Sequence, residues 1–224
     1  MNDFIGFWKT PPGLKTKEET ILALKNNGGL PDIPFKGEKV SNYDRDDRYF
    51  DKLHDIRGIS VNSESFQSSD FSYINLSYSN FHDCTFENVN FFCSRFHGAR
   101  FFGCKFSDCS LEGIYGSELH LESCSLKKVC LNSAFLINLK VKKSKMLDVD
   151  FSSTRIISPE FSQTLLEECD FRWARIASTR SFTKLIKKSK HSISLDNTQW
   201  LGNDGKPVPS PIKTRTVWNI FRKN

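Results

Sequence analysis

Every fifth residue between Ile56 and Ile176 is apolar, with the single exception of Gly116. The register runs through 25 positions without a slip, although only 38% of the chain is hydrophobic. An α-helix has 3.6 residues per turn and a β-strand alternates at every second residue, so neither has this period. The pattern predicts a chain that turns a corner at fixed intervals, which is typical of a solenoid.

A second set of positions supports the first. Two residues before each apolar position the side chain is usually small, as at Ser79, Cys84, Ser94, Cys104 and Ala134. One large and one small inward residue in each unit would fill a narrow tube without voids. The residue between these two is often Asp or Asn. Examples are Asp70, Asn75, Asn80, Asn90, Asp150 and Asp170.

The five-residue unit is visible in runs such as SDFSY, INLSY, SNFHD, VNFFC and CDFRW. From Ile56 to Thr179 the sequence resembles the pentapeptide-repeat family, whose unit is a small residue, Asp or Asn, Leu or Phe, a polar residue and any residue. The resemblance implies an all-β solenoid. Its form would be a right-handed, four-sided pentapeptide-repeat β-helix of about six coils, with short helical additions at the N- and C-terminal ends.

Four units of five residues make one coil, so each residue should stack on the residue twenty positions later. Phe71, Phe91 and Leu111 then share one side of the tube, and Phe81, Phe101 and Leu121 share another. Gly116 lacks an inward side chain and lies among departures from the pattern. It predicts either a local bulge or weakened corner, or a bend or short recognition loop.

The seven cysteines are expected to have a structural role. Five of them occupy the small inward positions, namely Cys84, Cys104, Cys109, Cys124 and Cys169. No cysteine or histidine pair has the spacing of a metal site, and the five histidines share no catalytic motif. We therefore expect no enzymatic activity, no cofactor and no metal. The N-terminus lacks the basic start and apolar run of a signal peptide, which favours a cytoplasmic protein, although delivery into another cell stays open.

The charge is uneven along the chain and suggests three regions. Residues 1–50 carry eight basic and eight acidic residues, 51–180 carry fifteen and sixteen, and 181–224 carry nine and two. We assign 1–50 to a cap or partner-binding segment with one short helix, from about Lys17 to Asn26 after a capping box at Thr16. Residues 51–180 form the β-helix, and 181–224 form a basic helix followed by an extended tail.

The predicted function is a non-catalytic protein-binding scaffold, because a filled tube leaves only its outer faces and termini for recognition. The resemblance favours a bacterial immunity-type or effector-type protein, with a toxin or host target as partner. The candidate contact residues are Lys140, Lys142, Lys143, Lys145, Lys187, Lys188, Trp200, Arg215, Trp218 and Phe221. The aromatic C-terminal segment is also the candidate site of a homodimer.

Two alternatives remain open. One is a topoisomerase (gyrase) binding and protection protein that mimics DNA, which the near-neutral rod disfavours. The other is binding of the basic tail to nucleic acid or an acidic surface; charge alone is weak evidence, so nucleic acid is not the expected partner. No apolar run approaches the length of a membrane span.

Overall fold

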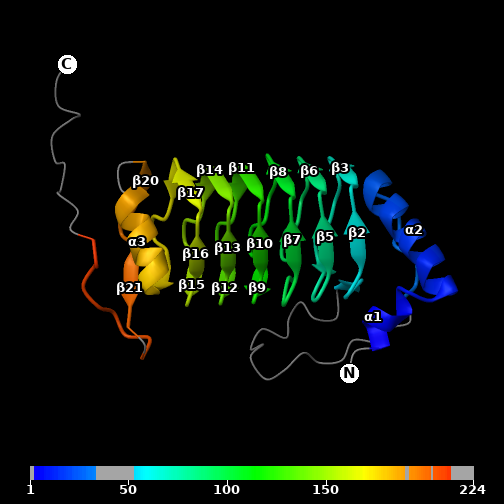
Figure 1. Ribbon diagram of the computed structural model, residues 1–224, viewed down its shortest axis with the longest axis horizontal. Coiled ribbons are helices and arrows are strands. Elements are labelled where there is room, and N and C mark those ends of the chain that lie inside the picture. The colour runs from blue at the N-terminus through cyan, green and yellow to red at the C-terminus, as the bar shows by residue number, and fades with distance from the viewer. Residues whose placement is uncertain (1–2, 34–52, 190–191, 203, 213–224) are drawn as a thin grey trace, which may run out of the picture.

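The computed structural model describes residues 3–33, 53–189, 192–202 and 204–212. Short parallel strands stack as rungs along one axis, with helices at both ends (Figure 1). The predicted all-β solenoid, a pentapeptide-repeat β-helix with short terminal helices, is confirmed. The longest stack has seven successive rungs, one more than the six coils expected from the sequence.

The parallel stacks follow the sides of the coil, and the eight-stranded sheet continues around one corner through β14 (Lys145–Asp150). The six-stranded sheet contains β2 (Ser60–Asn62), β5 (Asn80–His82), β7 (Arg100–Phe102), β10 (His120–Glu122), β13 (Lys140–Lys142) and β16 (Glu160–Ser162). The eight-stranded sheet contains β3 (Ser65–Gln67), β6 (Thr85–Glu87), β8 (Lys105–Ser107), β11 (Ser125–Cys130), β14 (Lys145–Asp150), β17 (Leu165–Glu167), β18 (Cys169–Asp170) and β20 (Ile193–Ser194). The five-stranded sheet contains β9 (Tyr115–Ser117), β12 (Phe135–Ile137), β15 (Arg155–Ile157), β19 (Arg175–Ala177) and β21 (Gln199–Leu201).

Two sides are completed by shorter pairings. Strands β1 (His54–Asp55) and β4 (Ile74–Asn75) pair with each other, and bridges through Arg95 connect β4 to β9. Parallel bridges join Asp70, Asn90, Ser110 and Cys130 on the remaining side. The pairing partners are twenty residues apart in every coil up to residue 177, which confirms the predicted register.

The apolar position of each unit points into the tube. Because paired strands lie about 4.8 Å apart, phenylalanines in the same register stack on one another. The ring centroids of Phe81 and Phe101 lie 4.9 Å apart and those of Phe151 and Phe171 lie 4.7 Å apart, with the planes nearly parallel in both pairs. The core therefore consists of side chains of the same type stacked in successive coils.

The small inward residues also bond between coils. The Ser94 hydroxyl donates to the Phe71 carbonyl at 2.5 Å, and the Thr154 hydroxyl donates to the Leu131 carbonyl at 2.8 Å. Both partners lie 23 residues earlier, in the neighbouring coil. These buried hydrogen bonds give a physical reason for the frequent Ser, Thr and Cys at this position, because the hydroxyl or thiol satisfies a carbonyl that faces the core.

The residues between the two inward positions shape the turns. The carboxylate of Asp70 accepts the N–H of Ser72 at 2.9 Å, and that of Asp150 accepts the N–H of Ser152 at 2.7 Å. This is the Asx-turn pattern. Asn80 differs, since its amide donates weakly to the Tyr78 carbonyl instead.

Every corner places one residue in the left-handed region. All residues at five-residue intervals from Gly58 to Trp173 have φ between 49° and 73°. Only four of these corner residues are glycines, namely Gly58, Gly98, Gly103 and Gly113. The left-handed conformation costs an L-residue about 1–2 kcal/mol, so most corners are held by the ladder hydrogen bonds of the coils on either side.

Gly116 lies in the middle of strand β9 and pairs in register with Leu136. A Cβ at this position would come within 2.9 Å of the Leu136 side chain. The nearby Ile114 and Leu119 are large residues at positions that are small elsewhere, and both are buried. The expectation of a bulge, bend or loop at Gly116 is wrong, because β9 keeps the register of its neighbour and the Leu136 side chain takes the place that a Cβ would need.

Two helices cover the N-terminal end, where the sequence predicts one. Helix α1 spans Asp3–Phe7 and α2 spans Pro11–Asn26. The predicted capping box at Thr16 is wrong. The helix begins six residues earlier than expected, because Thr10 caps the N–H of Gly13 and Pro11 supplies a first position that needs no donor.

Side chains of this N-terminal segment bond to the first coil. The Trp8 indole N–H donates to the Arg57 carbonyl at 2.7 Å, and Lys25 forms an ion pair with Glu64 at 2.5 Å. The Asn27 side chain donates to the Ser68 carbonyl and accepts from the Asp70 N–H. These bonds satisfy groups at the first edge of the solenoid that would otherwise invite pairing with another chain.

Helix α3 (Arg180–Ser189) packs on β16 and β17 at the other end. Its Phe182 is buried, and the Phe182 ring lies 5.0 Å from that of Phe161. The β-helical pairing does not stop at residue 180. Strands β20 and β21 pair with β18 and β19 at an offset of 24 residues, because the chain passes through α3 before it completes the last coil.

Candidate functional site

The interior of the solenoid is closely packed. A cavity inside the coils has a volume of about 20 Å³ and lies where phenylalanine gives way to leucine, with Phe106, Leu119 and Leu136 in its wall. All twelve lining residues are apolar, so the cavity lacks the polar partners that a bound water needs. Across 3–33, 53–189, 192–202 and 204–212, no three His, Cys, Asp or Glu residues come together as a metal site.

Two of the cysteines within the tube, Cys104 and Cys169, are held as unreactive thiols, whereas hydrogen bonding with Cys104 lowers the pKa of Cys124. Cys84, Cys104 and Cys124 stack in successive coils as free thiols, and each donates to backbone carbonyls. The hydrogen bond with Cys124, followed by burial, raises the pKa of Cys104 to about 12. Burial raises the pKa of Cys169 to about 11. Since the thiolate is the nucleophile and metal ligand, these residues serve the core.

The predicted lysine cluster lies on β13, β14 and the corner between them. Each of these lysines has an acidic partner from a neighbouring coil. The pairs are Lys140–Glu160 at 3.9 Å, Lys142–Glu122 at 3.2 Å, Lys143–Glu122 at 4.0 Å and Lys145–Glu167 at 3.1 Å. Their positive charge is thus partly compensated within the molecule, and a partner would have to compete with these glutamates.

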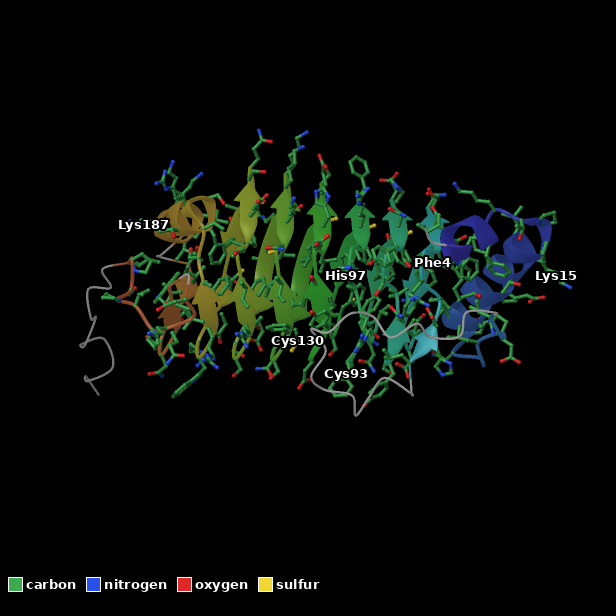
Figure 2. All side chains as sticks on the ribbon, turned by 90° about the horizontal axis from the view of Figure 1, so that it is seen from below. Phe4, Lys15, Cys93, His97, Cys130 and Lys187 are labelled. Carbon is green, nitrogen blue, oxygen red and sulfur yellow. The ribbon has the colours of Figure 1, made fainter. Side chains whose placement is uncertain are left out.

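The remaining predicted contact residues divide into three groups. Lys187 and Lys188 are exposed on α3, and Lys187 extends away from the solenoid in Figure 2. Trp200 is only 5% exposed and stacks in register on Ile176, so it closes the last coil and presents little surface to a partner. Arg215, Trp218 and Phe221, and with them the predicted homodimer segment, lie outside the described residues.

Sequence analysis missed a different surface on the five-stranded sheet. The Arg155 guanidinium lies 5.2 Å from the centroid of the Phe135 ring, and the Tyr115 ring lies 5.3 Å from it on the other side. Trp173, at the corner before β19, is 63% exposed. Reading the outward positions at intervals of twenty residues could have found this row, because arginine and aromatic residues recur there.

Comparison with known families decides the identity. The family model described as pentapeptide repeats matches residues 69–108 with eight copies, within the part of the chain that has the repeated pairing register. Residues 69–108 of this chain are pentapeptide repeats. No curated protein matches the sequence.

Several solved pentapeptide-repeat structures are similar in outline. A trypsin-treated variant of QnrB1, a plasmid-mediated fluoroquinolone resistance protein, is 13% identical, covers 66% of this chain and 90% of its own, and has a TM-score of 0.35. Rfr23 from the cyanobacterium Cyanothece 51142 is 15% identical, with coverages of 50% and 88% and a TM-score of 0.29. HetL, involved in heterocyst differentiation in Nostoc, is 12% identical, with coverages of 70% and 93% and a TM-score of 0.26. Likeness at this level carries no argument about the partner.

None of the helices described for this pentapeptide-repeat protein combines the length and apolar character required to cross a bilayer.

Proposed function

We propose that this pentapeptide-repeat protein is a non-catalytic protein-binding scaffold, of the immunity type or the effector type. The observation that carries the proposal is the filled interior. Phe66, Phe91 and Phe151 are completely buried, and the cavity between Phe106, Leu119 and Leu136 is lined by apolar side chains and about 20 Å³ in volume. A partner molecule must therefore bind to the outer faces or the ends of the solenoid.

Rigidity of the outer faces supports the same proposal. Neighbouring coils are joined by main-chain bonds, and side chains such as Asn132 and Ser152 bond across coils at 2.8 Å. Groups held at fixed spacings lose little conformational entropy when a partner binds. A solenoid of this kind presents a preorganised surface, which favours specific recognition of a protein with a matching shape.

The direct test is affinity capture from a native lysate with the full chain, beside a form truncated after Pro211. We expect one specific protein partner, whose capture weakens when the C-terminal segment is removed. Light scattering of the same two forms tests the proposed homodimer, because loss of the aromatic segment should halve the mass. Equal masses would remove the dimer, and the absence of any specific partner would count against the scaffold.

Gyrase protection is a distinct candidate that the charge distribution disfavours. Lysines on β13 and β14 alternate with glutamates across coils, so the described faces do not present a continuous acidic surface like that of duplex DNA. A supercoiling assay with gyrase, with and without a fluoroquinolone, separates the two functions. Protection of supercoiling by the purified chain would favour the alternative.

A further inference from the structure

The outward side of the five-stranded sheet differs in composition from the other sheets. Strands β9, β12, β15, β19 and β21 contain no Lys, Asp or Glu, whereas β13, β14 and β16 carry several. We call the outward residues Phe135, Ile137, Arg155, Ile157 and Arg175 the arginine–aromatic face. Arginine and aromatic residues are enriched in protein interfaces, and Lys and Glu are depleted there.

The two arginines of this face lack an acidic partner among the described residues. Arg155 lies over the Phe135 ring, and the Arg175 Nε–H donates to the Gln199 side-chain oxygen at 3.1 Å. Both arginines are exposed. By contrast, Lys142 and Lys145 each have a glutamate within 3.2 Å. The guanidinium groups thus retain donors that can bind an external carboxylate with two hydrogen bonds.

An apolar row lies beside the arginines. Phe135 and Ile137 of β12 and Ile157 of β15, in the next coil, are half-buried, and the register places Ile137 directly next to Ile157. Trp173 stands at the corner leading into this face, 63% exposed and with φ of 63°. A large indole in a left-handed corner and in contact with water contributes little to the fold. Exposed tryptophan is instead typical of residues that anchor a partner.

We propose that the arginine–aromatic face, together with Trp173, is the docking surface for an acidic segment of a partner protein. Carboxylates of that segment bind Arg155 and Arg175, while its apolar side chains cover Ile137, Ile157 and the indole. Charge complementarity selects this occupant. A single-stranded nucleic acid fits less well, because the isoleucine row offers no donor to a line of phosphates. The inference rests on the proposed scaffold function and names its surface.

Photo-crosslinking in the full chain tests the surface. Benzoylphenylalanine replaces Phe135 in one form and Leu147 of β14, which lies on the eight-stranded sheet, in the control form. Both are expressed in the organism from which the chain comes, irradiated, and analysed by mass spectrometry. We expect a single protein adduct from position 135, with a crosslinked peptide rich in Asp and Glu, and none from position 147.

Charge reversal then tests the chemistry. The double variant Arg155→Glu, Arg175→Glu should lower the adduct yield by about tenfold or more, since opposed carboxylates repel across the interface. Trp173→Ala should lower it as well without lowering the thermal midpoint, because the indole is largely exposed. Thermal unfolding of the double variant confirms that it still folds.

The outcomes separate the surface from the scaffold function. An adduct to nucleic acid, to a second copy, or to residues 34–52 of the same chain would overturn the proposed occupant. A yield unchanged by charge reversal would overturn it too. Adducts from position 147 alone would remove this surface while leaving the scaffold function standing. No adduct from either position, together with no partner in the affinity capture, would remove both.

Discussion

Two serines that occupy the same small inward position of their repeat units, on different sides of the coil, provide a matched test of the bonds between coils. Ser94 and Ser79 are both completely buried. The Ser94 hydroxyl donates to the Phe71 carbonyl at 2.5 Å and accepts the N–H of Ile74 at 2.9 Å. The Ser79 hydroxyl has no hydrogen-bond partner among the described residues. Replacing each serine by alanine removes the same oxygen from two equally buried sites.

The expected free energies of unfolding differ strongly. Ser94→Ala leaves a carbonyl and an N–H without a partner, and each buried unsatisfied group costs about 1–3 kcal/mol. The total loss is then on the order of 3 kcal/mol, or roughly 6–12 °C in the thermal midpoint of a chain of this length. Ser79→Ala removes a hydroxyl that is already unsatisfied, so we expect a change close to zero or a small gain in stability.

Urea unfolding followed by circular dichroism measures both variants against the parent chain. The slope of the transition should stay the same, which indicates that the exposed surface on unfolding is unchanged. Equal destabilisation by Ser79→Ala and Ser94→Ala would refute the argument. Hydroxyls at this position would then contribute through packing alone.

Three further predictions concern the core, the thiols and the N-terminal cap. Phe101→Ala should lower the free energy of unfolding by about 3–5 kcal/mol. Phe102 lies on the opposite side of the strand and is 44% exposed, so Phe102→Ala should lower it far less. Similar urea midpoints for the two variants would contradict the inward placement of Phe101. Burial raises the pKa of Cys169 to about 11, so its contribution to stability is complete below the unfolded value of about 8.5 and is lost as pH rises towards the folded value. Between these two pKa values the urea midpoint of the parent chain should fall as pH rises, and Cys169→Ala should make this fall smaller. An equal fall in the variant would show that the Cys169 thiol does not cause it. Trp8→Phe removes the hydrogen bond to the Arg57 carbonyl and should cost about 1–2 kcal/mol in thermal unfolding, with an unaltered midpoint counting against the cap.

The charge of each candidate binding surface depends on which side chains lie next to one another in adjacent coils. The sequence places Lys142 and Lys145 close together, which predicts a positive cluster. Residues on adjacent coils lie about 4.8 Å apart in the stack, so Glu122 and Glu167 reach those lysines. The same stacking brings Phe135 beneath Arg155. A linear reading of charge misses both effects, because the partners are twenty or more residues apart.

The ends of the solenoid were less predictable than its middle. Tryptophan is a residue type typical of interface anchors, yet Trp200 pairs with Ile176 because the chain resumes its coil after α3. The sequence of residues 181–201 does not predict this further coil, because the spacing between paired residues changes from 20 to 24. The sequence analysis also misplaced the start of α2, because it took Thr16 as the cap, whereas Thr10 caps the N–H of Gly13 and the helix continues through Thr16.

The amino-acid order alone determined the solenoid, its register and its inward residues. A five-residue period repeated over 25 positions places one apolar side chain of each unit on the inside of the coil, so local pattern and global fold agree. Only the tertiary structure decided how non-glycine residues such as Trp173 hold left-handed corners, how Leu136 fills the space at Gly116, and where uncompensated arginines face solvent. These features depend on contacts between successive coils, which arise only when the chain has stacked on itself.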